Sequence, residues 1–122
     1  MKKFPALALL SLILGGCATS PTTPRHAPTP TPDLAGLWVG KASAQTHTLL
    51  VRPDGTGTVC WESMGKYSAM PLTISGDKMI GLTDATLKRN ADGSFAQCSW
   101  GVCMEMKRTM DVPAACRAWL KR

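Results

Sequence analysis

Residues 50–61 read LVRPDGTGTVCW, and this stretch decides the fold class of the chain. Its Asp54-Gly55 dipeptide supplies the positive-φ positions of a tight hairpin turn, so the flanking apolar residues belong to two antiparallel strands. The stretch 87–100, LKRNADGSFAQCSW, repeats the pattern: an Asp-Gly dipeptide, a cysteine six residues after the aspartate, and a tryptophan within two more. This echo predicts two hairpins, with Cys60 and Cys98 at matching heights on the returning strands.

Turn signals of this kind recur along the chain, at 53–55, 64–66, 75–77, 90–93 and 100–101. Short runs rich in Val, Ile, Leu, Thr and Met lie between them, and the runs 70–74 and 102–106 carry an apolar residue at every second position. The pattern predicts an all-β fold, a compact antiparallel meander or small barrel of about seven or eight short strands. We expect the strands near 36–43, 46–52, 56–62, 69–75, 78–83, 85–90, 94–99 and 102–108.

The last residues of the chain break the β pattern. Asp111 is a helix-cap candidate, Pro113 suits a first helical turn, and two alanines follow the proline. Cationic residues gather toward the C-terminus, where they suit the helix dipole. We therefore expect one short C-terminal helix that packs Trp119 and Leu120 onto the sheet.

The N-terminus carries the features of a targeting segment. Lys2 and Lys3 precede an apolar run from 4 to 14, which is too short for a transmembrane helix of about 20 residues and suits a signal peptide. Leu14-Gly15-Gly16-Cys17 follows this run and resembles the lipobox of bacterial lipoproteins. The alternative is a secretory signal with an incidental cysteine.

The resemblance to lipoproteins implies that residues 1–16 are a signal peptide and that Cys17 becomes the acylated first residue of the mature chain. Two or more acyl chains anchor a protein stably, so the membrane is the first expected partner. In lipoproteins an aspartate after the cysteine favours inner-membrane retention, whereas this chain has Ala18. We therefore expect a lipid-anchored protein of the outer membrane that faces the periplasm.

Composition divides the remaining chain into two parts. Residues 18–32 are mostly proline and threonine and have almost nothing to bury, so we expect a disordered tether at 17–33 and a small β-domain at 34–122.

Without Lys2 and Lys3, the 12 remaining lysines and arginines against 8 acidic residues give a net charge of +4. This charge is mild and is spread over short basic pairs, so nucleic acid is not an expected partner.

Assigning Cys17 to the lipid leaves an even set of four cysteines, which an exported chain uses for disulfides. Cys103 shares a strand face with charged residues at 105 and 107, so it points outward, where the expected C-terminal helix can lie over it. This favours a Cys103–Cys116 bridge and a Cys60–Cys98 bridge between the matching hairpins. The alternative is Cys98–Cys103 across a four-residue loop, together with Cys60–Cys116.

Sets of catalytic or metal-ligating residues are not evident in the sequence. His47 is the only histidine of the β-domain, and we interpret it as a surface residue on a strand edge. Aspartates fall in expected turns, where they bond to nearby backbone amides. Cys98 and Cys103 have a zinc-like spacing, but export favours their oxidation. We therefore expect no enzyme activity, no cofactor and no metal site.

Gly36-Leu37-Trp38, at the start of the first expected strand, resembles the Gly-x-Trp start of lipocalins and similar small barrels. The resemblance implies a compact barrel-like sheet in which Trp38 closes one end and an arginine near the last strand packs on it. Arg108 takes that place by position. A barrel of about 90 residues filled by Trp, Met and Leu leaves little room for a lipocalin-like ligand cup.

The main functional hypothesis is a non-catalytic binding or structural module whose partner is an envelope protein or the cell wall. The alternative is an inhibitor or immunity protein against a cell-wall-degrading enzyme, because membrane-bound lysozyme inhibitors are similar small, disulfide-containing β-barrel lipoproteins. In that case the loop 64–68 is the suspected contact, since Lys66 and Tyr67 on a glycine turn suit an acidic cleft. A small carrier of apolar ligands is the third hypothesis.

Overall fold

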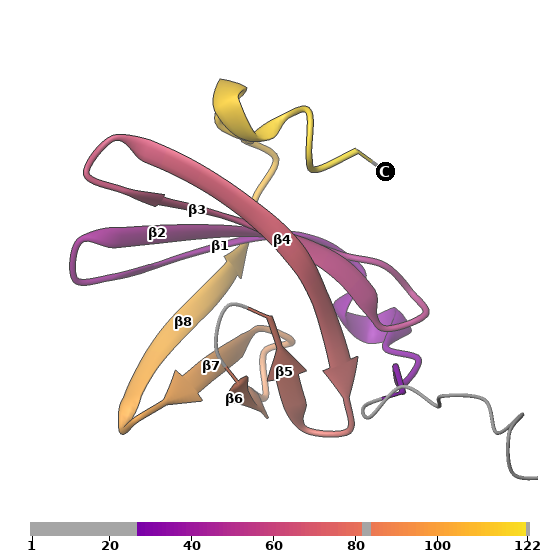
Figure 1. The fold of residues 1–122 in the computed structure, drawn as a ribbon. Helices are drawn as coiled ribbons and strands as arrows, with labels where there is room; N and C mark the ends of the chain where they lie inside the picture. The colour runs from indigo at the N-terminus through magenta and orange to yellow at the C-terminus, as the bar shows by residue number, and fades with distance from the viewer. Residues whose placement is uncertain (1–26, 82–83, 122) are drawn as a thin grey trace, which may run out of the picture.

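The computed structural model describes residues 27–81 and 84–121, which form a closed barrel of eight antiparallel strands (Figure 1). The strands follow one another in sequence order, and β8 closes the barrel against β1. Their bounds are β1 Gly36–Ala42, β2 Gln45–Val51, β3 Thr56–Ser63, β4 Lys66–Ser75, β5 Lys78–Ile80, β6 Asp84–Arg89, β7 Phe95–Ser99 and β8 Val102–Arg108. Within these residues no helix has the length and apolarity to cross a membrane. The expected signal peptide and Cys17 lie outside the described residues.

The expected all-β fold class is confirmed, and each expected strand has a counterpart in the barrel. One difference is at β4, which begins at Lys66 rather than near residue 69. The ladder between β3 and β4 continues up to the pair Ser63 and Lys66. The loop expected at 64–68 is therefore only a two-residue turn at 64–65.

Alternate residues of the strands fill the barrel interior. Trp38, Phe95 and Met106 have no exposed surface, and the rings of Trp38 and Phe95 pack edge to face with centroids 4.7 Å apart. The rest of this inner core comes from the segment before β1 and from every strand except β1 and β7: Leu34, Leu49, Val51, Val59, Leu72, Ile74, Met79, Ala85, Leu87 and Met104. The interior is thus a packed core, as expected for a barrel of this size.

One end of the barrel is closed by Trp38 and Arg108. The guanidinium carbon of Arg108 lies 4.3 Å from the centroid of the Trp38 ring, which confirms the pairing that the lipocalin resemblance implied. Arg108 also donates hydrogen bonds to the carbonyl oxygens of Ala35, at 2.9 Å, and Asp33, at 3.0 Å. The Trp38 indole donates to the carbonyl of Leu34 at 2.8 Å, within a short 3-10 turn, η2 Pro32–Leu34.

Residues before the expected boundary at 33 already bond to the barrel. The amide of Thr29 donates to the Ile74 carbonyl at 2.8 Å, and the amide of Thr31 donates to the Pro53 carbonyl at 2.9 Å. Thr31 is buried. The last residues of the expected tether 17–33 therefore lie at the closed end, because their backbone amides bond to the turn that follows β2 and to the end of β4.

The expected C-terminal helix is replaced by a single 3-10 turn, η3 Ala114–Cys116. A helix of ten residues is marginal unless packing supports it, and this tail is held by other contacts. Cys116 and Leu120 are buried against the outside of the barrel, in a second apolar cluster with Leu37, Leu50 and Cys60. Leu120 therefore packs on the sheet as expected, whereas Trp119 stays 44% exposed.

The disulfides are Cys60–Cys116 and Cys98–Cys103, so the favoured connectivity is wrong and the alternative is correct. Cys98 and Cys103 face each other in the ladder between β7 and β8. Cys103 points outward as expected, but the tail does not cover it. After β8 the chain turns toward β1, where the Thr109 amide bonds to the Leu37 carbonyl, and continues to the outer face that carries Cys60.

Candidate functional site

The turns at 43–44, 64–65 and 100–101 lie at the end of the barrel opposite the closed one. Alternate connections of an up-and-down barrel share an end, and these three join β1 to β2, β3 to β4 and β7 to β8. Figure 1 shows the three hairpin tips on the left side of the molecule. We call residues 43–44, 64–67 and 100–102 the open-end rim.

The rim carries large apolar side chains that no part of the described chain covers. Trp100 is 94% exposed, Met64 is 88% exposed and Val102 is 60% exposed. Away from the rim, only Met110 and Trp119 have comparable exposure among the large apolar residues described. Met64 stands on the β3–β4 tip, whereas Trp100 and Val102 stand on the β7–β8 tip. Exposed apolar surface of this kind makes each tip a candidate interaction site.

The backbone at Met64 and Trp100 is unusual for these residue types. Both have φ of 54°, and the glycine after each also has positive φ, 80° at Gly65 and 79° at Gly101. A two-residue turn with positive φ at both positions favours Asn-Gly or Gly-Gly, because a side chain with a Cβ is strained there by about 1–2 kcal/mol. Turn stability therefore does not explain methionine and tryptophan at these tips, and strain of this kind points to function.

The Cys98–Cys103 disulfide holds the hairpin that presents Trp100. It joins register partners on β7 and β8, separated from the turn by the single pair Ser99 and Val102. The cross-link limits how far the two strands can separate, so Trp100 is displayed on a fixed support. A fixed side chain loses less conformational freedom on binding than a mobile one.

Lys66 and Tyr67 lie at the rim but do not share a face. They are the first two residues of β4, where successive side chains point to opposite sides of the sheet. Lys66 pairs with Ser63, and Tyr67 pairs with Glu62. Met70 on the inner face and Ala69 on the outer face place Lys66 on the inner side and Tyr67 on the outer side. The suspected loop is thus split between two surfaces.

The inner face near the rim is polar, and His47 is at its centre. Leu49 and Val51 of β2 lie in the inner core, so His47, two residues earlier, faces inward and is half-buried. Its Nε2 lies 3.1 Å from Oε1 of Gln45, and its Nδ1 lies 3.2 Å from Nε2 of Gln97. Burial lowers the pKa of His47 below its usual value of 6.5. The interpretation of His47 as a surface residue on a strand edge is therefore wrong.

The carboxylates of Asp54 and Asp92 serve the hairpin turns, as expected. Asp54 accepts hydrogen bonds from the amide and hydroxyl of Thr56, at 2.9 and 2.7 Å, and Asp92 accepts the same pair from Ser94. These bonds lower the pKa of both carboxyl groups below 3.8. Across 27–81 and 84–121, no three histidines, cysteines or acidic residues are grouped closely enough to hold a metal ion.

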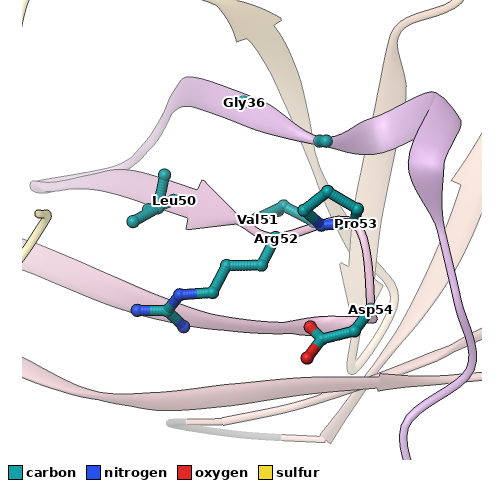
Figure 2. A pocket seen from close by; sticks show the side chains of 7 residues that line it. Gly36, Leu50, Val51, Arg52, Pro53 and Asp54 are labelled. Carbon is teal, nitrogen blue, oxygen red and sulfur yellow. The ribbon is translucent and has the colours of Figure 1, made fainter. Parts of the chain in front are cut away.

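A shallow groove lies on the outside of the barrel near the closed end (Figure 2). It has a volume of about 630 Å³ and is lined by the start of β1, the end of β2 and the following turn: Ala35, Gly36, Leu50, Val51, Arg52, Pro53 and Asp54. The Asp54 carboxylate already accepts hydrogen bonds from Thr56. The groove therefore offers apolar surface and one guanidinium, and it holds no nucleophile paired with a base.

Comparison with known proteins finds a likeness of fold. No family model and no curated protein sequence matches the chain. Among solved structures, the crystal structure of a lipoprotein YedD from Klebsiella pneumoniae subsp. pneumoniae MGH 78578 is similar, with a TM-score of 0.55 and 20% sequence identity. The likeness covers 78% of this chain and 89% of that chain. At this identity it shows a shared fold.

Proposed function

We propose that this protein is a lipid-anchored envelope lipoprotein whose barrel is a non-catalytic binding module, with the open-end rim as its contact surface for an envelope protein. The observation that carries the proposal is the pair Met64 and Trp100. Both side chains are almost fully exposed, and both stand at positive-φ positions where asparagine or glycine is the stable choice. A tryptophan is also the residue most enriched among those that dominate binding energies.

The anchor is proposed from the lipobox resemblance of Leu14-Gly15-Gly16-Cys17, with outer-membrane, periplasm-facing localisation from Ala18. The fold likeness to a protein named a lipoprotein supports it. Thr29 and Thr31 bond to the closed end of the barrel, so a chain anchored through Cys17 is attached at that end. The rim lies at the end away from this attachment, where an envelope protein can reach it.

The proposal is tested by capture of envelope proteins on the immobilised chain. Met64→Asn and Trp100→Asn remove the apolar groups and relieve the strained φ, so both variants should fold at least as stably as the original protein. Loss of a dominant contact costs roughly 2 kcal/mol, so each variant should bind the captured protein about thirtyfold more weakly.

Met110→Asn is the matched control, because Met110 is also 88% exposed but lies after β8, away from the rim. Its affinity for the captured protein should not change. Equal binding by the original protein and both rim variants would reject the rim as the contact surface.

Inhibition of a cell-wall-degrading enzyme is the second candidate, and the position of Lys66 favours it. Lys66 is exposed beside Met64 at the rim, where a cation next to an apolar tip suits the acidic cleft of such an enzyme. Lys66→Ala should then weaken the inhibition, whereas Tyr67→Ala, on the other face, should have the smaller effect. Inhibition that survives both changes would exclude this role for the β3–β4 tip.

A further inference from the structure

Two methionines of β8 and His47 of β2 converge on one point inside the barrel. The amide nitrogen Nε2 of Gln97 lies 3.2 Å from His47 Nδ1, 3.3 Å from Met104 Sδ and 3.9 Å from Met106 Sδ. One imidazole nitrogen and two thioether sulfurs therefore surround the position that this nitrogen fills. The three groups come from strands that are distant in sequence and are brought together by the closure of the barrel.

The tautomer of His47 leaves a lone pair aimed at this point. The Gln45 carboxamide oxygen can only accept, so His47 Nε2 carries the proton and donates to Gln45 Oε1 at 3.1 Å. Nδ1 is then the unprotonated nitrogen that faces Gln97 and the two sulfurs. A neutral imidazole whose second nitrogen is held by a hydrogen-bond acceptor is the usual arrangement of a metal-ligating histidine.

The absence of a side chain at Gly40 leaves room for the two methionine sulfurs beside this point. Gly40 lies directly beside them, because a Cβ at Gly40 would clash with Met106 Sδ and lie 2.9 Å from Met104 Cγ. The Gln97 amide is half-buried and faces two thioether sulfurs. Thioethers are weak hydrogen-bond acceptors, so these contacts stabilise the amide only slightly. Packing stability alone therefore does not explain why a glutamine amide fills this position.

We propose that His47 Nδ1, Met104 Sδ and Met106 Sδ form a binding site for a soft monovalent cation, Cu(I), with the Gln97 amide turning aside when the ion enters. Thioethers select Cu(I) over harder ions, and imidazole also suits copper. The four cysteines of the barrel are all in disulfides, so thioethers and imidazole are the soft ligands left in the described chain. The site is reached from the open end, where His47 and Gln97 are half-buried.

The test uses the full chain with Cys17→Ser, so that no free thiol competes, and Ag(I) as a redox-inert stand-in for Cu(I). Methionine methyl NMR reads the site directly. One equivalent of Ag(I) should shift the Met104 and Met106 methyl signals and leave those of exposed Met64 and Met110 in place. Anaerobic Cu(I), titrated against a chelator of known affinity, should give the same stoichiometry.

Variants separate the ligands from general packing. Met104→Leu and His47→Gln should each weaken binding by roughly a hundredfold or more, because loss of a group that only orients a ligand already costs about 10–100-fold. Met79→Leu is the matched control, since Met79 is buried in the same core and its sulfur is not one of those that contact Gln97 Nε2. Gln97→Ala should retain or raise the affinity.

Two results would overturn the proposal. One is a set of Ag(I)-induced shifts confined to Met64 and Met110, which would mean surface binding only. The other is equal affinity of the original protein and the Met104→Leu variant. The methyl shifts need no variant, so the proposal stays testable if a substitution prevents folding.

Discussion

At the residue scale, the face of the sheet on which His47 lies decides whether this residue belongs to the surface or to the barrel interior. A shift of one position along a strand moves a side chain from one face of the sheet to the other. His47 was expected on the surface at a strand edge, but Leu49 and Val51 of the same strand lie in the inner core, so His47, two residues before Leu49, faces inward as well. The signal that could have found it was this apolar alternation at 49 and 51. Met104 and Met106 carry no such signal, because alternating methionines on a strand are typical of an ordinary apolar core face.

The burial of His47 predicts a pH dependence of stability. The folded state lowers the pKa of His47 below 6.5, so the unfolded chain binds the proton more readily than the folded one. The free energy of unfolding should therefore fall as the pH drops below 6.5. Asp33, Asp54 and Asp92 have pKa values lowered from 3.8, so their contributions are lost only under more acidic conditions.

Urea unfolding of the metal-free protein between pH 7.5 and 4.5 measures this dependence. His47→Gln should make the free energy of unfolding less dependent on pH over this range. His26→Gln, at the chain's other histidine, should leave the dependence unchanged. A slope that persists in the His47 variant would assign the effect to other groups.

At the element scale, local signals predicted the parts of the fold that depend on neighbouring residues. The Asp-Gly turns at 54–55 and 92–93 form the same hydrogen-bonded turn with positive-φ glycines, as their shared sequence indicated. The tail was predicted less well, because its path depends on which outer face offers an apolar surface. The disulfide pairing depends on the same path, because the tail carries Cys116 to the outer face where Cys60 lies. For the rim, the sequence located the turns but not the exposure of Trp100.

The two disulfides should differ in their effect on stability. Cys60–Cys116 closes a loop with a sequence separation of 56, and Cys98–Cys103 closes one of 5. By loop entropy the first contributes about 4 kcal/mol and the second about 2 kcal/mol. The Cys60→Ala/Cys116→Ala double variant should therefore lose about twice as much unfolding free energy as the Cys98→Ala/Cys103→Ala variant.

Urea unfolding of both double variants under oxidising conditions checks this order. The first variant should also release the tail to added protease, since Cys116 holds it on the outer face. The second should keep its tail protected. Equal losses would show that the native state, rather than the unfolded chain, sets the contribution of each bridge.

At the scale of the whole molecule, the two ends of the barrel have opposite characters. The closed end is held by Trp38, Arg108 and an ion pair between Arg89 and Asp33, whose side-chain atoms lie 2.9 Å apart. It also receives the chain that leads back to residue 17. The open end carries the exposed apolar tips and the polar interior around His47. Under the proposed function, attachment belongs to the closed end and recognition to the open end, so the two should be separable.

Cys17→Ala tests that separation. The lipobox resemblance predicts that the variant is not acylated and keeps its signal peptide, so its mass should be that of the full chain and labelled palmitate should not be incorporated. The barrel should fold as before, since its two bridges use the other four cysteines. Capture of the envelope partner by the purified variant should stay dependent on Trp100. A variant that is processed normally would contradict the lipobox, whereas an unacylated, folded variant that no longer captures the partner would tie recognition to the lipid instead of the rim.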